Sequence, residues 1–248
     1  MRSSTSTLLI VNAKGILNAR DPWRGTLHKL TEKGLALLQV SLPGMEPQLE
    51  PQAPPLAERL SSAAQLAEEG VPVTVRVSPH IPRFSPTARE EVEAFVSVLK
   101  EAGVKHLILE FLRGEPQFFT LLAEKFGIEE LRELEAYSLR ETSGEPSLAR
   151  VRFALRAAVA LAYAETARRA GLTFATCMEG LLELHTAPDC CGAYLLEGAA
   201  LRTTLGDVYR HVSLRGPTSP LELAAACAGW GRFAGASCWS TRGRSRSP

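Results

Sequence analysis

Hydrophobic and polar positions change their period repeatedly along the first half of the chain, from helical spacing to strand alternation. The clearest example lies within residues 49–82. One helical stripe is apolar, at Leu56, Leu60, Ala63, Ala64 and Ala67. Gly70 ends this predicted helix, and Pro72 prevents its continuation. A strand follows, with Val73, Val75 and Val77 on one face and Thr74, Arg76 and Ser78 on the other.

The same change of period occurs on both sides of this stretch. Apolar runs predict further strands at residues 8–11, 35–42 and 107–112. Helical spacing predicts a helix at residues 23–33 and another that starts at Ser85-Pro86 and ends at Gly103. Strand and helix therefore alternate at least four times. This alternation predicts an α/β fold, a partial TIM-like (β/α) barrel of parallel strands over residues 1–115.

The second half predicts a mainly helical extension over residues 116–216. Its expected helices are 116–126, 128–139 and 147–170, and a strand at 172–177 precedes a cysteine-bearing loop at 178–192. From Pro217 the pattern is lost, so residues 217–248 are expected to be a disordered tail.

Composition narrows the possible partners only slightly. The formal net charge is +1, which provides no global attraction to nucleic acid or membrane. No apolar run reaches bilayer length, and the start of the chain does not resemble a signal peptide. We therefore expect a cytoplasmic protein that does not bind membranes, with reduced cysteines.

Lys14 and Ser41 each follow an apolar strand, so both are expected at the carboxyl ends of neighbouring strands. An ammonium and a hydroxyl there can both donate hydrogen bonds to a carboxylate. The alternative is an exposed lysine and a serine that merely ends a strand.

Arg76 is the charged residue of an otherwise apolar strand. If it faces inward it needs an anionic partner, because an unpaired buried charge is costly, and Glu110 or a ligand carboxylate could serve. It could equally point outward between helices. Glu110 and Arg113 are weaker candidates for the same end of the sheet.

Cys177, Cys190, Cys191 and His185 lie within one short segment after a predicted strand. Thiolates and an imidazole suit zinc or an iron–sulfur cluster, although the spacing is not a standard zinc pattern. Asp189 and Glu179 could support such a site. The alternative is buried, inert cysteine, and adjacent cysteines rarely pair with each other in a disulfide. The other two cysteines, Cys227 and Cys238, are expected to be free thiols.

The chain resembles the spore photolyase-like branch of the radical SAM superfamily in two segments, LEPQAP followed by RL, and GVPVTVRVSPHIP. The resemblance covers about residues 8–115. It implies that Lys14 and Ser41 hold the carboxylate of S-adenosylmethionine. It also implies that Arg76, Ser78 and Pro79 lie beside the adenine. The implied chemistry is reductive cleavage of S-adenosylmethionine by an iron–sulfur cluster, on a substrate that could be a nucleic-acid lesion. Relatives with extra cysteines imply an auxiliary cluster at Cys177, Cys190 and Cys191.

The sequence departs from the family at its defining motif. It has no CxxxCxxC, and no cysteine precedes Cys177. Three explanations remain open. We expect an incomplete gene product; the alternatives are a second chain that supplies the strands of the barrel absent from this chain, or a non-catalytic barrel. Activity of this chain alone is accordingly uncertain, and no catalytic residue is predicted. The alternatives to a radical SAM enzyme are a partner-binding remnant and an unrelated zinc-binding barrel.

Overall fold

The structure is a computed structural model that describes residues 8–44, 50–82, 84–126, 137–138, 148–197, 209, 212–216, 219 and 222. The chain divides into two compact units, Met1–Ala199 and Ala200–Pro248. All of the elements described below lie in the first unit. The predicted tail, with Cys227 and Cys238, lies almost wholly outside the described residues.

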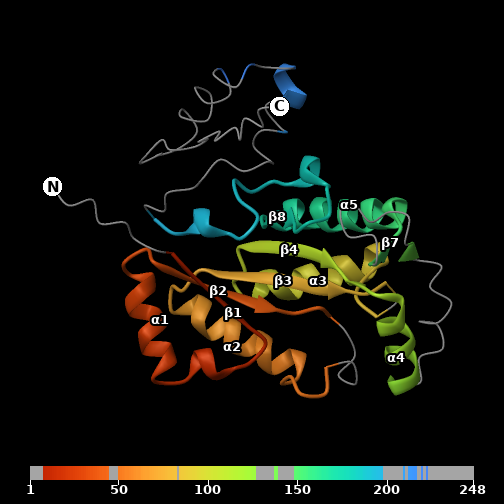
Figure 1. Cartoon of the computed structure of the whole chain (residues 1–248). Helices are drawn as coiled ribbons and strands as arrows, with labels where there is room; N and C mark the ends of the chain where they lie inside the picture. The colour runs from red at the N-terminus through yellow and green to blue at the C-terminus, as the bar shows by residue number, and fades with distance from the viewer. Residues whose placement is uncertain are drawn as a thin grey trace, which may run out of the picture. The chain divides into compact units, whose positions relative to one another are not determined.

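The first unit is built on a five-stranded parallel sheet (Figure 1). Its strands are β1 (Leu9–Ala13), β2 (Ala36–Ser41), β3 (Val73–His80), β4 (His106–Phe111) and β8 (Thr173–Thr176), and they lie side by side in chain order. The intervening helices are α1 (Trp23–Thr31), α2 (Leu56–Glu68), α3 (Arg89–Glu101) and α5 (Phe153–Ala170), with the 3-10 turn η1 (Leu17–Ala19) before α1. The predicted parallel α/β sheet is confirmed. Its described strands form an open sheet whose edges are β1 and β8.

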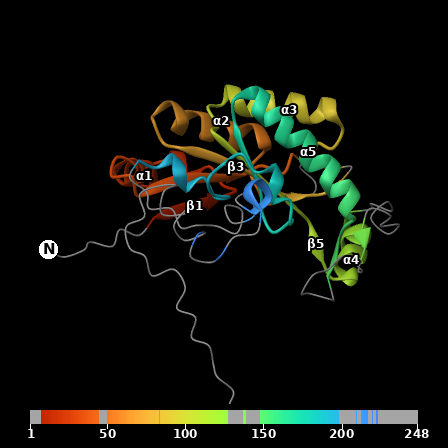
Figure 2. The ribbon, with the colours of Figure 1, turned by 90° about the horizontal axis from the view of Figure 1, so that it is seen from above.

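One face of the sheet is apolar and is covered by helices. Helices α2, α3 and α5 lie along the same side of the strands (Figure 2). Val40, Val75 and Leu109 belong to the same buried cluster as Val96 of α3 and Tyr163 of α5. Alternation puts every second strand residue on this face, which explains why the valines of β3 are fully buried.

The opposite face, here called the polar face, carries polar side chains alongside apolar ones, in rows across the strands. Strand register aligns one row as Asn12, Gln39, Thr74, His106 and Thr173, and the next row toward the carboxyl ends as Ser41, Arg76, Ile108 and Ala175. Polar side chains on a sheet face need partners or water. This face, not the helix-covered one, can therefore carry chemistry.

Residues 186–197, here called the covering segment, cross the first of these rows. The carbonyl of Cys190 lies 3.2 Å from His106 Nε2, and the hydroxyls of Tyr194 and Thr173 are hydrogen-bonded. Gly192 has a φ of 81°, and a Cβ there would lie 2.6 Å from the Thr74 methyl group, so only glycine fits against the sheet. Two short turns, η5 (Leu182–Leu184) and η6 (Ala193–Leu195), shape the chain here.

The predicted helical extension was wrong in part, because some of its residues form a second, antiparallel sheet. It consists of β5 (Arg113–Gly114), β6 (Tyr137–Ser138) and β7 (Ala149–Val151), with β7 in the middle, and α4 (Pro116–Phe126) follows β5. The helix predicted over 147–170 begins only at Phe153, because Arg150 pairs with Arg113 and Val151 is fully buried. Residues 137 and 138, predicted as helix, are strand, and residues 128–136 lie outside the described part.

The start of α3 also differs from the prediction. The helix begins at Arg89, not at Ser85-Pro86. The Ser85 hydroxyl instead accepts a hydrogen bond from the amide of Ile81, and the Pro86 carbonyl accepts one from the Tyr163 hydroxyl. Glu91 caps the helix by accepting hydrogen bonds from the amides just before it.

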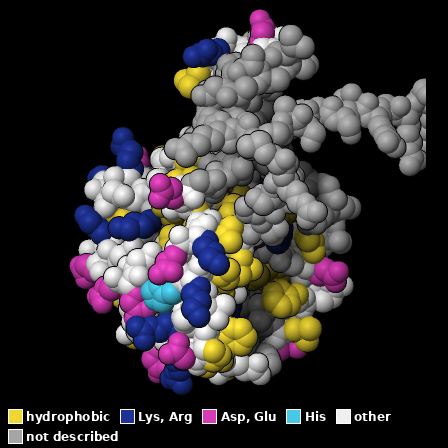
Figure 3. Space-filling model, turned by 90° about the vertical axis from the view of Figure 1, so that its left-hand side faces the viewer, with side chains coloured by type: hydrophobic (Ala, Val, Ile, Leu, Met, Phe, Trp, Pro, Cys, Tyr) yellow, Lys and Arg dark blue, Asp and Glu magenta, His cyan; other side chains and the backbone are white. Residues whose placement is uncertain are grey.

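Strand β1 forms one edge of the sheet and pairs, within the described residues, with β2 alone. Hydrophobic side chains gather on the surface at this side of the molecule (Figure 3). Large exposed residues from this part of the chain include Leu9, Leu17 and Trp23. An open apolar edge can pair with another strand. No helix within the described ranges has the length and apolar character needed to cross a membrane.

Candidate functional site

The polar face brings most of the predicted ligand-binding residues to one end of the sheet. Lys14 follows β1, Ser41 ends β2, and Arg76, Ser78 and Pro79 lie in the second half of β3. All are at carboxyl ends, because the strands are parallel. Ligands in parallel α/β proteins bind at this end. The structure thus places these residues together, and their role in binding stays a prediction.

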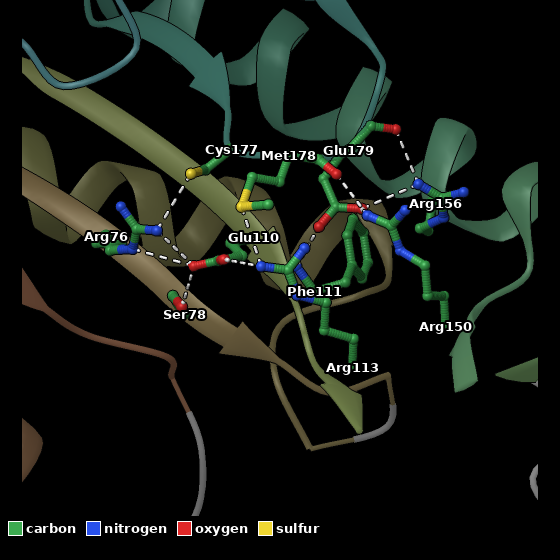
Figure 4. A network of polar contacts seen from close by, with 10 residues as sticks. All are labelled: Arg76, Ser78, Glu110, Phe111, Arg113, Arg150, Arg156, Cys177, Met178 and Glu179. Carbon is green, nitrogen blue, oxygen red and sulfur yellow. Dashed lines mark hydrogen bonds and ion pairs between the residues drawn. The ribbon is translucent and has the colours of Figure 1, made fainter. Parts of the chain in front are cut away.

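Arg76 is the centre of a polar cluster that we call the open network (Figure 4). Its guanidinium donates two hydrogen bonds to the Glu110 carboxylate, at 3.1 Å and 2.5 Å, and one to Cys177 Sγ at 3.2 Å. Ser78 donates to the same oxygen of Glu110 at 2.8 Å. Arg76 therefore faces the polar side of the sheet, with Glu110 as its anionic partner, rather than pointing outward between helices.

The open network keeps a charged guanidinium beside an uncharged thiol. Burial disfavours the charge, but the hydrogen bonds to Glu110 and Cys177 and the attraction of the Glu110 carboxylate outweigh it and raise the pKa of Arg76. Burial also raises the pKa of Cys177, and the nearby guanidinium only partly offsets this. Cys177 is thus a thiol at neutral pH. The Arg76 and Glu110 side chains remain 18% and 16% exposed, so the network is within reach of a ligand.

Lys14 and Ser41 already have partners within the chain. Lys14 Nζ lies 2.6 Å from one oxygen of Glu50, and Arg59 Nη2 lies 2.6 Å from the other. Ser41 Oγ donates to the carbonyl of Ser78 at 2.9 Å, and Arg59 donates to the carbonyl of Ser41. Burial raises the pKa of Glu50, but Lys14 and Arg59 outweigh it and the net pKa is lowered. This position therefore stabilises a carboxylate.

Glu50 and Arg59 were not assigned a role from sequence, although both belong to the segment that carries the resemblance. Arg59 is only 3% exposed and lies beside the apolar stripe of α2. This charged residue beside an apolar stripe was the signal in the sequence for a buried ion pair, because a buried arginine requires an acceptor. The alternating polar residues of β3, together with His106 and Glu110 of β4, were a second signal for the polar face.

The three predicted metal ligands lie in the same region, and their binding of a metal stays a prediction. Within the described ranges, no group of three or more His, Cys, Asp or Glu side chains is arranged to hold an ion. Cys190 and Cys191 are adjacent, with sulfurs 3.6 Å apart, and both are half-buried free thiols. Cys177 is instead hydrogen-bonded to Arg76, and His185 Nε2 accepts a hydrogen bond from the amide of Thr176.

The remaining candidates have structural partners. Asp189 accepts hydrogen bonds from the amides of Cys191, Ala193 and Tyr194, which holds the turn around the cysteines. Glu179 forms ion pairs with Arg156 at 2.9 Å and Arg150 at 3.7 Å, a group that we call the closed network. Arg113 lies between the two networks, 3.7 Å from Glu110 (Figure 4).

Comparisons with protein families, with curated proteins and with solved structures found no match for this chain. The functional argument therefore depends on the geometry of the polar face.

Proposed function

We propose that the chain is part of a radical SAM-like β/α barrel and that it binds S-adenosylmethionine at the carboxyl ends of β1 to β4. The observation that carries the proposal is the position of Lys14, Ser41, Arg76 and Ser78 at the carboxyl ends of three neighbouring parallel strands, in a sheet whose strands follow chain order. In doubly wound folds the strand order reverses, whereas in β/α barrels it follows the chain. Helices on a single face of the sheet are also typical of a barrel wall.

The charges at this end of the sheet suit an amino-acid carboxylate and ammonium. Lys14 and Arg59 already hold one carboxylate, that of Glu50, and the Lys14 side chain is still 48% exposed. A ligand carboxylate would share Lys14 with Glu50 or replace it there. The acceptor for a ligand ammonium would be Glu110, which is partly exposed beside Ser78. The ligand's charges would thus be complemented by side chains of the chain itself.

An iron–sulfur cluster does not fit the residues that the structure describes. The sequence has no CxxxCxxC motif, and Cys177, Cys190 and Cys191 are not grouped as ligands of one centre. The proposal therefore covers recognition of the ligand by this chain and includes no cleavage step.

Binding of S-adenosylmethionine to the purified chain tests this proposal, by calorimetry with S-adenosylhomocysteine as a second ligand. Lys14→Ala and Ser41→Ala should each weaken binding, with Lys14→Ala reducing affinity about tenfold or more because it removes a charge-assisted hydrogen bond. Matched controls are Lys29→Ala and Ser61→Ala, two exposed positions on α1 and α2. Absence of binding to the folded wild-type chain, or equal losses in the controls, would refute the proposal.

A further inference from the structure

The adjacent thiols Cys190 and Cys191 lie in the covering segment, and their two sulfurs have a geometry of their own. Their sulfurs lie 3.6 Å apart, and neither cysteine is in a disulfide. A disulfide would require the sulfurs to approach to about 2.05 Å, in a pairing that is strained for adjacent residues. The observed separation therefore does not favour a disulfide.

A single soft atom bridging both sulfurs fits the separation better. Two bonds of about 2.3 Å that meet at roughly a tetrahedral angle place their sulfurs about 3.8 Å apart. Two such bonds in a straight line would place them about 4.6 Å apart, which excludes a linear two-coordinate ion without movement. The geometry suits a centre with bent coordination.

The turn that carries the two thiols is held in place from three directions. The Asp189 carboxylate accepts three backbone amides, the Cys190 carbonyl contacts His106, and Gly192 packs against Thr74. These anchors reduce the motion that the thiols would lose on binding. A chelating pair that is already ordered binds more tightly than two independent thiols.

We infer that Cys190 and Cys191 form a chelating site for a trivalent arsenic or antimony centre. Such a centre bonds thiolates at bent angles and needs at most one further ligand, whereas zinc needs four, and the described residues do not offer them. With an organoarsenic(III) oxide, two S–As bonds form, and both thiol protons leave with the oxide oxygen as water. Arsenic stays trivalent, so no oxidant or reductant is needed.

Phenylarsine oxide tests this inference on the full chain in a Cys227→Ser/Cys238→Ser background, with adducts read by intact mass spectrometry. The parent should take up one phenylarsenic group, keep it in excess glutathione, and lose it to 2,3-dimercaptopropanol. Cys190→Ser and Cys191→Ser should each weaken retention about a hundredfold or more, because chelation is lost. The control Cys177→Ser should retain the group.

Three outcomes would overturn the site. Glutathione could strip the parent as readily as the single variants, Cys177→Ser could lose the group equally, or the two thiols could be isolated as a disulfide that excludes the reagent. The competition on the parent protein decides the question even if a variant fails to fold. Because the assay contains no S-adenosylmethionine, its result is independent of the function proposed above.

Discussion

Two arginine–glutamate networks lie next to each other at the carboxyl end of the sheet, and they differ mainly in burial (Figure 4). In the open network, Glu110 and Arg76 are 16% and 18% exposed and are joined by Ser78 and Cys177. In the closed network, Glu179 is 2% exposed and Arg156 is 5% exposed. Glu179 also accepts the backbone amide of Phe111 at 2.9 Å.

One turn of backbone supplies both networks. Cys177 and Glu179 flank Met178, whose φ of 60° lies in the left-handed region that non-glycine residues seldom adopt. Cys177 enters the open network, whereas Glu179 enters the closed one. The arginine–glutamate pairs of the closed network thus connect the turn after β8 to β7 and α5, whereas the pair of the open network remains available to a ligand. Burial, rather than residue type, separates a structural ion pair from a candidate binding site.

The largest expected effect is in the closed network. Arg156→Met leaves Glu179 buried without its nearest cation and should lower the free energy of unfolding by about 3–5 kcal/mol. Urea denaturation followed by circular dichroism measures this loss. Adding Glu179→Gln to the same chain removes the uncompensated charge, so it should recover part of the lost free energy of unfolding. A cost below about 1 kcal/mol for Arg156→Met would show that the closed network is not structural.

The next largest effect is expected on the pH dependence of stability, and it comes from a buried neutral ring, His80, rather than from a buried ion pair. Burial lowers the pKa of His80 to about 4, while its ring contacts Phe111 and Tyr163. The unfolded chain binds this proton near pH 6.5 and the folded chain does not. Stability should therefore fall between pH 6.5 and about 4 by roughly 1.4 kcal/mol per pH unit.

His80→Gln provides the control, because it cannot titrate in this range. The difference between its unfolding free energy and that of the wild type should shrink as the pH falls. Parallel pH profiles for the two proteins would contradict the assigned burial of the ring.

A smaller effect on stability is expected in the open network. Arg76→Met should cost about 1 kcal/mol, because solvent reaches both partners of the ion pair. Its effect on S-adenosylmethionine affinity should be larger than its effect on stability, and calorimetry alongside urea denaturation separates the two. A loss of stability as large as that of Arg156→Met would remove the distinction between the networks.

The smallest effect is expected at two exposed ion pairs that share Arg89. Arg89 contacts Glu93 and Glu165 on the surface of α3 and α5, with 55% of its side chain exposed. Arg89→Ala should leave thermal unfolding unchanged within the error of calorimetry, since solvent screens the pair. A clear decrease in melting temperature would mean that exposure is a poor guide to the role of an ion pair in this protein.

Sequence reasoning was accurate where a single element determines its own pattern. Alternating valines predicted β3, and the apolar run after Gly34 predicted β2, because a strand between two neighbours must bury one face. It failed for residues 149–151, where alanine and arginine favour a helix but pairing with β5 and β6 imposes a strand. It also misplaced the start of α3, since hydrogen bonds from distant residues hold Ser85 and Pro86 in a loop.

The candidate site shows the same division. The predicted strand ends correctly placed Lys14, Ser41 and Arg76 at the carboxyl end of the sheet, because parallel strands run in the same direction. The partners could not be predicted in the same way. The contact of Lys14 with Glu50 and the contact of the Cys190 carbonyl with His106 each join segments that are far apart in the chain.

The amino-acid order alone therefore specified a parallel α/β sheet with a polar face at its carboxyl ends, since local periodicity encodes burial. Folding in three dimensions determined which charges are paired, and which carboxylate is buried and which is partly exposed. It also determined that Cys177 bonds to Arg76, whereas the sulfurs of Cys190 and Cys191 lie next to each other. Those properties depend on distances between residues separated by up to a hundred positions, and no local pattern contains them.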